Sequence, residues 1–99
     1  MSPRPQLDPL VHAPVRLAIM SSLVPVEEIE FTALRDQIGA TDGNLATHIA
    51  KLEKAGYVKV RKRFVRRKPK TLYCLTSEGR AAFEAYLAAL ERLLPPRGP

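Results

Sequence analysis

Few residues of this chain could carry out bond-making chemistry. Hydrolysis needs a nucleophile with a base, a pair of carboxylates or a metal-binding set. The chain has one cysteine, Cys74, and two histidines, His12 and His48. Spread over those positions, they form no such set. We therefore expect no enzyme, no metal and no cofactor, with Cys74 packed in a strand and His12 in a local hydrogen bond.

Basic residues are the chemical feature that the sequence does supply, and they give the chain a formal net charge of +6. Half of the sixteen lysines and arginines lie between positions 59 and 70, and no acidic residue interrupts them. These residues are Lys59, Arg61, Lys62, Arg63, Arg66, Arg67, Lys68 and Lys70. Such a concentration of positive charge indicates a polyanionic partner.

A predicted β-hairpin carries this basic cluster. From Tyr57 the pattern changes to a period of two, because Val58 and Val60 alternate with basic residues. A second run, residues 71–75, can return antiparallel after a connection formed by residues 64–70. We expect the hairpin to contact phosphates through these side chains: Arg61, Arg63, Arg66, Arg67, Lys68 and Lys70.

The segment before residue 26 is predicted to be helical. Asp8 followed by Pro9 fits an N-cap with proline at the first helical position of a short turn. Pro14 then starts a longer helix, because proline cannot donate a hydrogen bond inside one. Apolar residues at helical spacing make this helix largely buried, and Pro25 ends it.

Two shorter helices are predicted on either side of residues 39–41. The first follows an edge strand at residues 29–31, begins with Thr32 as its cap and is closed by Gly39. The second is capped by Thr41 or Asp42 and ends at Gly56. A three-residue turn with glycine between two helices is typical of a helix-turn-helix, whose second helix enters the major groove of DNA.

A last helix, capped by Thr76, follows the hairpin. The predicted order is therefore α-β-α-α-β-β-α, and the fold class is α+β, mainly α: a winged helix-turn-helix with a C-terminal dimerisation helix. Residues 7–94 form the single domain. The proline-containing tails, residues 1–6 and 95–99, are expected to be disordered.

The helix between Thr41 and Gly56 has an apolar side and a polar side. Leu45, Ile49 and Leu52 point toward the core, which leaves the other side for DNA. His48 admits two interpretations, a phosphate donor or a structural hydrogen-bond partner. The candidate contacts of this recognition helix are Thr41, Gly43, Asn44, Thr47, His48 and Lys51.

Three segments resemble the compact MarR-like winged-helix transcriptional regulators: DPLVHAPVRLAIM, TDGNLATHIAKLEKAGYVKV and PKTLYCLTSEGRAAFEAYLAAL. The resemblance covers about residues 7–94 and includes the specific motif LxxHIxKLExxGYV, from Leu45 to Val58. It implies a bacterial or archaeal dimeric DNA-binding regulator whose first and last helices form the dimer. Thr47 stands where relatives often have arginine or serine, so the base preference is not carried over.

The last helix has more apolar residues than a three-helix core and a small hairpin can cover, and exposed apolar surface favours aggregation. We therefore expect a homodimer. Two-fold pairing would place two recognition helices in successive major grooves, about 34–36 Å apart, on a pseudo-palindromic operator. The expected interface residues are Leu7, Leu10, Val11, Phe83, Tyr86, Leu87, Leu90, Leu93 and Leu94.

These observations together favour a sequence-specific dimeric repressor that binds duplex DNA. The alternative is a winged-helix module that binds RNA or a protein partner without operator specificity; the recognition helix lacks the aromatic residues that single-stranded RNA recognition uses. The resemblance also implies a small-molecule effector between the dimer helices. The chain shows no secretory signal and no run of about 18 apolar residues, which predicts a cytoplasmic protein without membrane association.

Overall fold

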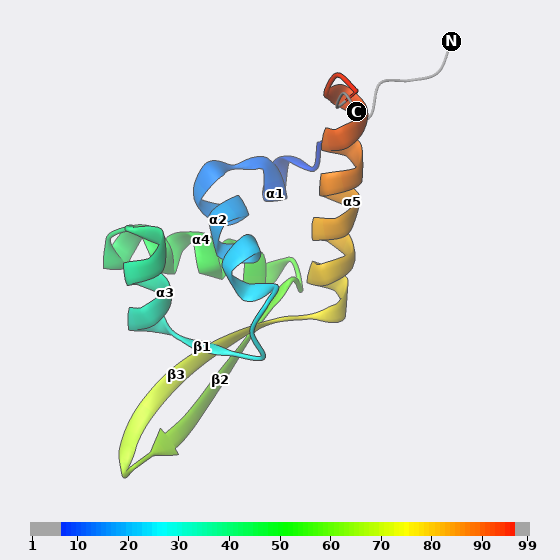
Figure 1. The fold of residues 1–99 in the computed structure, drawn as a ribbon. Coiled ribbons are helices and arrows are strands. Elements are labelled where there is room, and N and C mark those ends of the chain that lie inside the picture. Colours follow the sequence, from blue (N-terminus) through cyan, green and yellow to red (C-terminus); the bar gives the residue numbers. More distant parts are fainter. Residues whose placement is uncertain (1–6, 97–99) are drawn as a thin grey trace.

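Residues 7–96 are described by the computed structural model of this 99-residue chain, and they form five helices and three strands. The elements follow the order α-α-β-α-α-β-β-α (Figure 1). The predicted winged helix-turn-helix is confirmed, with one additional single-turn helix where a turn was expected. Disorder was predicted for residues 1–6 and 95–99, of which 1–6 and 97–99 lie outside the described residues. Pro95 and Pro96 follow the last helix in irregular structure.

Two helices begin at prolines, as predicted. Helix α1 spans Pro9–His12, and the side chain of Asp8 accepts a hydrogen bond of 2.9 Å from the backbone N–H of Leu10. Helix α2 spans Pro14–Leu23 and buries Ile19, Met20 and Leu23. Because proline has no N–H to donate, each of these helices starts where the preceding chain cannot continue as a helix.

The helix-turn-helix consists of α3 (Phe31–Ile38), residues 39–41 and α4 (Asp42–Lys54). Gly39 has φ of 80°, a left-handed conformation that glycine adopts readily and that ends α3. The predicted cap Thr32 is wrong: α3 begins at Phe31 with Glu30 as its N-cap, because strand β1 (Ile29–Glu30) runs directly into the helix. Thr41 caps α4, which leaves Asp42 as its first helical residue.

The wing, which we define as residues 58–75, is longer and tighter than predicted. Strands β2 (Val58–Val65) and β3 (Lys68–Leu75) pair antiparallel, and only Arg66 and Arg67 connect them. The predicted connection of residues 64–70 is therefore wrong. Beyond Val60 neither face of the hairpin is covered by the core, so no apolar alternation marks the distal strand positions.

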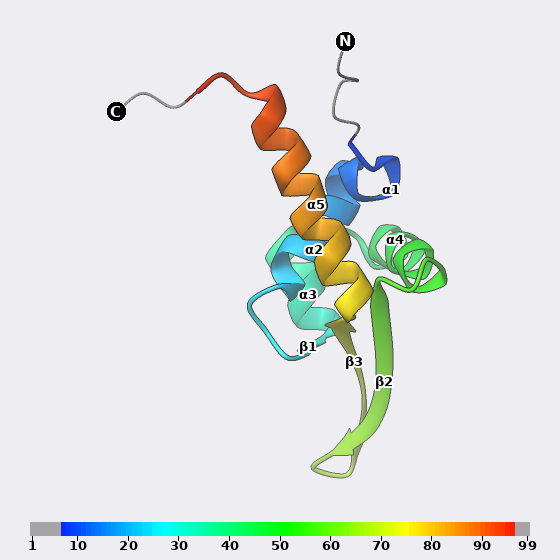
Figure 2. The same ribbon diagram turned by 90° about the vertical axis from the view of Figure 1, so that its right-hand side faces the viewer.

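The sheet has the strand order β1-β3-β2, and the short strand β1 pairs with β3 at Ile29–Tyr73. Helix α5 (Ser77–Leu93) follows the sheet and begins with Thr76 as its cap, as predicted. It packs against α1, α2 and β3, and its C-terminal half extends beyond the other helices (Figure 2). The wing thus projects from one end of the molecule and α5 from the other.

The hydrophobic core joins all five helices to the base of the sheet. Its fully buried large side chains are Val11, Ile19, Met20, Leu23, Leu34, Leu45 and Leu52. Phe83 and Tyr86 of α5 also belong to it. The prediction that the dimer interface includes Val11, Phe83 and Tyr86 is therefore wrong, because the chain itself already buries these three side chains.

His12 connects the first helix to the last one. Its Nδ1 atom lies 3.0 Å from the hydroxyl of Tyr86, 74 positions away in the chain. The expected local hydrogen bond of His12 is therefore wrong. A polar contact between α1 and α5 supplements the apolar packing there.

Gly79 provides a stability test of the packing at the start of α5. A Cβ atom at this position would clash with the backbone carbonyl of Tyr57, which accepts a hydrogen bond of 3.0 Å from the N–H of Thr76. We expect Gly79→Ala to lower the free energy of unfolding by about 1–3 kcal/mol, as overpacking does. Urea denaturation measures this change.

The matched control is Gly43→Ala, because a Cβ atom at Gly43 in α4 has no neighbour within 4 Å. Alanine favours a helix over glycine by up to about 1 kcal/mol, so this variant should be as stable as the parent or more stable. Equal stabilities of the two variants would contradict the packing described for Gly79.

Candidate nucleic-acid interface

One side of α4 is fixed against the core and the other faces solvent. Leu45, Ile49 and Leu52 are buried, as predicted. Five of the six predicted recognition-helix residues are exposed, and His48 is half-buried. The exposed five are Thr41, Gly43, Asn44, Thr47 and Lys51.

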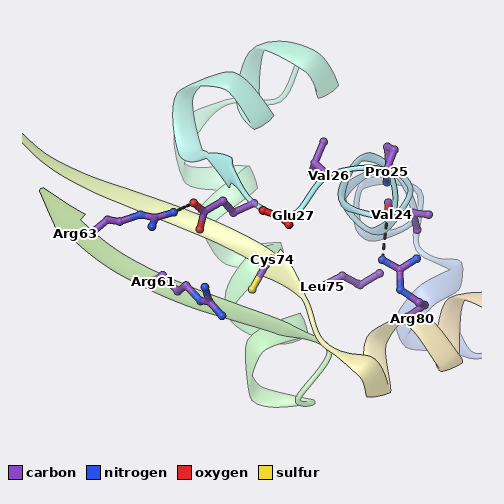
Figure 3. A pocket seen from close by; sticks show the side chains of 10 residues that line it. Val24, Pro25, Val26, Glu27, Arg61, Arg63, Cys74, Leu75 and Arg80 are labelled. Atoms are coloured by element: carbon purple, nitrogen blue, oxygen red, sulfur yellow. Dashed lines mark hydrogen bonds and ion pairs between the residues drawn. The ribbon is translucent and has the colours of Figure 1, made fainter. Parts of the chain in front are cut away.

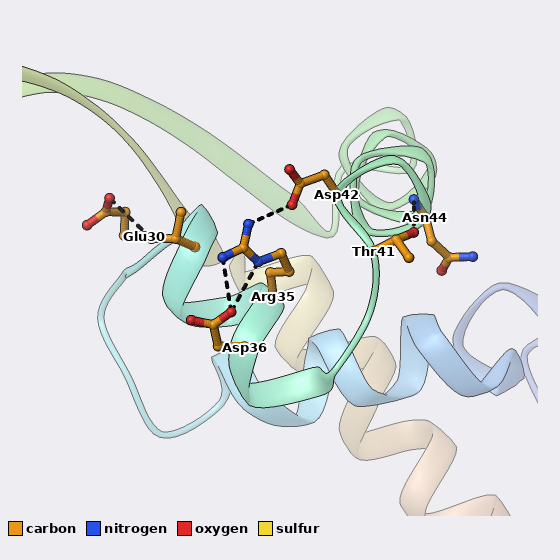
Figure 4. A network of polar contacts seen from close by, with 7 residues as sticks. Glu30, Arg35, Asp36, Thr41, Asp42 and Asn44 are labelled. Carbon is orange, nitrogen blue, oxygen red and sulfur yellow. Dashed lines mark hydrogen bonds and ion pairs between the residues drawn. The ribbon is translucent and has the colours of Figure 1, made fainter.

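Arg35 holds the two helices of the helix-turn-helix together (Figure 4). Its Nη1 atom donates to Asp42 Oδ1 at 2.8 Å, and its Nε atom donates to Asp36 Oδ1 at 3.1 Å. These hydrogen bonds, to Asp42 first, raise the pKa of the Arg35 guanidinium above its usual value. The negative charge of Asp42 at the start of α4 is thereby balanced by a partner that the sequence analysis missed.

Two hydrogen bonds, one at the N-terminus of α4 and one inside it, determine which polar groups on its exposed side remain available to a partner. The Thr41 hydroxyl accepts from the backbone N–H of Asn44 at 3.2 Å, which leaves the Asn44 side-chain amide exposed to solvent. The Thr47 hydroxyl donates to the carbonyl of Gly43 at 2.8 Å. Because its proton is committed to the helix backbone, Thr47 presents its methyl group and oxygen lone pairs outward.

His48 has a structural hydrogen-bond partner, one of the two interpretations left open by the sequence. Arg16 Nη1 lies 3.1 Å from His48 Nδ1, and a guanidinium can only donate, so Nδ1 accepts and Nε2 carries the proton of the neutral ring. The pKa of His48 is lowered by burial first, and then by the positive charges of Arg16 and Lys51. Arg16 also donates to the carbonyl of Leu10 at 2.6 Å and so ties α4 to the first helix.

The alternation of side chains gives the wing two faces. Paired residues of an antiparallel ladder share a face, so Val60, Lys62 and Phe64 lie with their partners Tyr73, Thr71 and Pro69. We call this the inner face, because four of these residues line a shallow hollow of about 380 Å³ together with Ala46, Ala50 and Glu53 of α4. The inner face and the recognition helix thus border the same concave surface.

Most of the basic residues occupy the opposite, outer face of the wing. They are Lys59, Arg61, Arg63, Lys68 and Lys70. Two of them meet acidic residues that precede or form β1: Arg63 pairs with Glu28, and Lys70 Nζ lies 3.1 Å from Glu30 Oε1. The prediction of an uncompensated basic cluster is therefore wrong for Arg63 and Lys70.

The tip of the wing keeps its positive charge. Arg66 and Arg67 are exposed, and neither has an ion-pair partner within residues 7–96. Both have positive φ, 53° and 66°, as the first and second central positions of a type I′ turn require. This turn lies at the end of the hairpin that is farthest from the helices (Figure 1).

A second hollow, of about 630 Å³, lies between the outer face of the wing and the connection from α2 to β1 (Figure 3). Arg61 and Arg80 line it together with residues 24–28 and Cys74. Arg80 donates to the carbonyl of Val24 at 3.2 Å. Cys74 is half-buried in β3, as predicted, with its sulfur 3.8 Å from the carbonyl of Lys59.

The part of the chain that the structure describes contains no group of three or more histidine, cysteine, aspartate or glutamate side chains placed to hold a metal ion. Within the same residues, no helix has the length and apolar character needed to cross a membrane.

Comparison with known proteins places these features in a family context. Residues 15–94 match the family model described as a winged helix DNA-binding domain. An uncharacterized protein of Methanocaldococcus jannaschii is 34% identical over 84 residues, which are 85% of this chain and 91% of that protein.

Two solved structures resemble this one closely. A transcriptional regulator homologue from Pyrococcus horikoshii has a TM-score of 0.80 and 33% identity, with 85% of this chain and 83% of that chain covered. A protein of Enterococcus faecalis assigned to the MarR family of transcriptional regulators has a TM-score of 0.73 and 26% identity, with 85% and 74% covered.

The contact between Arg16 and His48 predicts how His48 titrates. A histidine pKa that is lower in the folded state means that the unfolded chain binds the proton more readily. The resulting stabilisation is present above the ordinary pKa of about 6.5 and is lost as the pH falls toward the folded pKa. An NMR titration should find the pKa of His48 below 6.5.

Arg16→Met should raise the pKa of His48 toward its ordinary value, because it removes a positive charge and a group that covers the ring. Lys51→Gln should raise it less, since Lys51 is the smallest of the three causes. A pKa at or above 6.5 in the parent protein would contradict the described contact.

Proposed function

The chain belongs to the winged helix DNA-binding domain family, and from that membership we propose that it is a dimeric, sequence-specific repressor of the MarR-like type. One observation carries this proposal. The buried stripe of α4 fixes an exposed polar side with Asn44, Thr47 and Lys51, and the tip of the wing carries two arginines that have no ion-pair partner within residues 7–96. A major groove admits such a helix, and the adjacent backbone offers phosphates to such a tip.

The exposed groups of α4 suit base edges. The free amide of Asn44 can bind adenine through two hydrogen bonds, the methyl group of Thr47 can contact a thymine methyl, and Lys51 can donate to guanine or to phosphate. Thr41 and Gly43 lie at the helix N-terminus, where backbone N–H groups favour a phosphate. The neutral ring of His48 keeps Nε2–H as a donor for a phosphate.

The wing contributes to affinity unevenly in this proposal. Arg66 and Arg67 contact phosphates, because no acidic residue within the described chain competes for them. Arg61 and Lys68 lie on the outer face and assist at longer range. Arg63 and Lys70 contribute little, since Glu28 and Glu30 already neutralise them.

This division of the wing predicts a difference between two double variants of equal charge change. Each phosphate contact adds roughly 0.9 to the logarithmic salt slope of binding. Arg66→Gln with Arg67→Gln should therefore lower the slope by about 1.8, whereas Arg63→Gln with Lys70→Gln should lower it by less than half as much. Titration of labelled duplex DNA at four salt concentrations measures the salt slope of each double variant. Equal slopes for the two variants would refute the proposal that Arg66 and Arg67 contact phosphates.

Sequence specificity is predicted to depend on α4. Asn44→Ala should reduce the discrimination between operator and random duplex by about 1–3 kcal/mol, because it removes a bidentate contact. Thr47→Ala should do the same, while Thr47→Val should retain most of it, since valine keeps the methyl group. Selection of bound sequences from random duplexes supplies the operator; unchanged discrimination in all three variants would exclude α4 as the reading element.

The dimer is supported by apolar surface at the far end of α5. Leu87, Leu93 and Leu94 are 41%, 44% and 48% exposed, and Leu90 is half-buried. Leu7 and Leu10 are also half-buried and complete the proposed interface. A second copy that covers these side chains would remove a contiguous apolar surface from water.

Light scattering tests the dimer directly. The parent protein should have twice the chain mass of 11.0 kDa, and Leu87→Glu with Leu94→Glu should have the mass of one chain, because buried unpaired carboxylates oppose association. Val26→Glu is the control, since Val26 is also exposed and lies outside α5. A parent protein with the mass of one chain would end the dimer proposal.

The remaining features of the regulator stay predictions: a repressing rather than activating role, a cytoplasmic location and a small-molecule effector. The alternative function, RNA or protein binding without operator specificity, predicts that in one titration single-stranded RNA binds at least as tightly as duplex DNA, or that neither nucleic acid binds. We favour DNA because α4 exposes groups suited to base edges and no aromatic ring.

A further inference from the structure

Phe64 on the wing is the most exposed large apolar side chain of the described residues, with 76% of its surface accessible. Its cross-strand partner is Pro69, and the two form the pair directly before the last pair of the hairpin, Val65–Lys68. A small hollow is lined by Phe64, Pro69, Lys62 and Thr71 together with two outer-face neighbours. The wing therefore presents a compact apolar pair with positive charge on both sides.

The core does not explain this phenylalanine. The hairpin extends beyond the hollow next to α4, which reaches only as far as Lys62 and Thr71, and the next inner-face pair, Phe64 and Pro69, is exposed. An exposed aromatic side chain of this size leaves the favourable free energy of burying its apolar surface unrealised. A surface partner that buries it would recover this free energy.

The surroundings of Phe64 specify the chemistry of such a partner. Lys62 lies on the same face, Arg66 and Arg67 lie two and three residues away, and Lys68 neighbours Pro69. The partner must therefore offer negative charge on either side of an apolar strip. The minor groove of DNA has this character, with phosphate walls and a floor of sugars and base edges into which proteins insert phenylalanine and proline.

The position of Phe64 relative to α4 supports the same partner. Phe64 and Pro69 share the inner face with Val60 and Tyr73, which border the hollow next to α4. A duplex in contact with the exposed side of α4 therefore meets the inner face of the wing further along its axis. The two-residue turn keeps this end of the hairpin narrow.

We propose that Phe64, supported by Pro69, is an apolar contact of the wing with the DNA minor groove. This inference rests on the proposed function and adds a specificity element to it. The minor groove of a G·C pair carries the guanine N2 amino group, which A·T pairs lack. Phe64 therefore makes the wing favour pairs without that amino group, at positions that α4 does not read.

Inosine separates this contact from major-groove reading. An inosine·cytosine pair has the major-groove groups of G·C but lacks the N2 amino group in the minor groove. Three duplexes should carry A·T, G·C or inosine·cytosine at the positions flanking the α4 site. We expect the parent protein to bind the A·T and inosine·cytosine duplexes equally and the G·C duplex about tenfold more weakly.

Phe64→Ala should bind the A·T duplex about tenfold more weakly than the parent protein and lose the preference among the three duplexes, with an unchanged salt slope. Phe64→Leu should keep most of the preference. Val65→Ala is the matched control, because Val65 is the adjacent exposed apolar residue on the outer face, 42% exposed, and should change neither value.

The outcomes distinguish this inference from the proposed function. A parent protein that binds none of the duplexes overturns the proposed function itself. A parent protein that binds them while Phe64→Ala retains its affinity and preference overturns only the role of Phe64. A lower mass of Phe64→Ala in light scattering, with unchanged DNA binding, assigns the side chain to contact with a second copy and also overturns it.

Discussion

The burial of one stripe of α4 is the constraint on which the rest of the structure depends. Leu45, Ile49 and Leu52 lie almost entirely within the core, and each buried aliphatic side chain of this size contributes roughly 1.5–3 kcal/mol. A rotation of α4 about its axis would expose these side chains, so the helix has one favourable orientation. The exposed side that carries Asn44 and Thr47 is therefore set by apolar packing rather than by any polar contact of its own.

Polar contacts then adjust the positions of the helices, whose orientation apolar packing has already set. Arg35 joins α3 to α4 through Asp42, and Arg16 joins α4 to the N-terminal segment through His48 and the carbonyl of Leu10. A hydrogen bond adds little net stability and a solvent-exposed ion pair is weakened by screening, so these contacts adjust the positions of the helices more than they hold the fold together. The same is true of Glu28 and Glu30, which tie the distal half of the wing to the segment around β1 through Arg63 and Lys70, and which pair with neither Arg66 nor Arg67.

The sequence allowed the helices and their order to be predicted because most helix ends carry a local signal, the start of α3 being the exception. Asp8, Thr41 and Thr76 cap helices through bonds to N–H groups two or three residues on, and Gly39 ends α3 in a left-handed conformation. The ion pairs of the wing could not be predicted, because Glu28 and Arg63 are distant in sequence and meet only through the pairing of β1 with β3. Phe64 was also missed: the sequence placed residue 64 in the connection between the strands, and only the structure shows that it lies in β2 with most of its surface accessible.

The turn at the tip of the wing shows that a well-packed core can hold a short segment of the backbone in a strained conformation. Both Arg66 and Arg67 adopt positive φ, a conformation that costs non-glycine residues about 1–3 kcal/mol and that Asn-Gly would adopt with less strain. A longer loop would avoid that strain but would broaden the end of the hairpin. In the proposed function, a narrow tip with two arginines is what reaches the phosphates, and Phe64 stands directly behind it. The strain lies in these two residues, whereas the buried stripe of α4 and the core around it supply the free energy that tolerates it. The strained turn thus lies where, in this proposal, DNA rather than the protein itself completes the contacts.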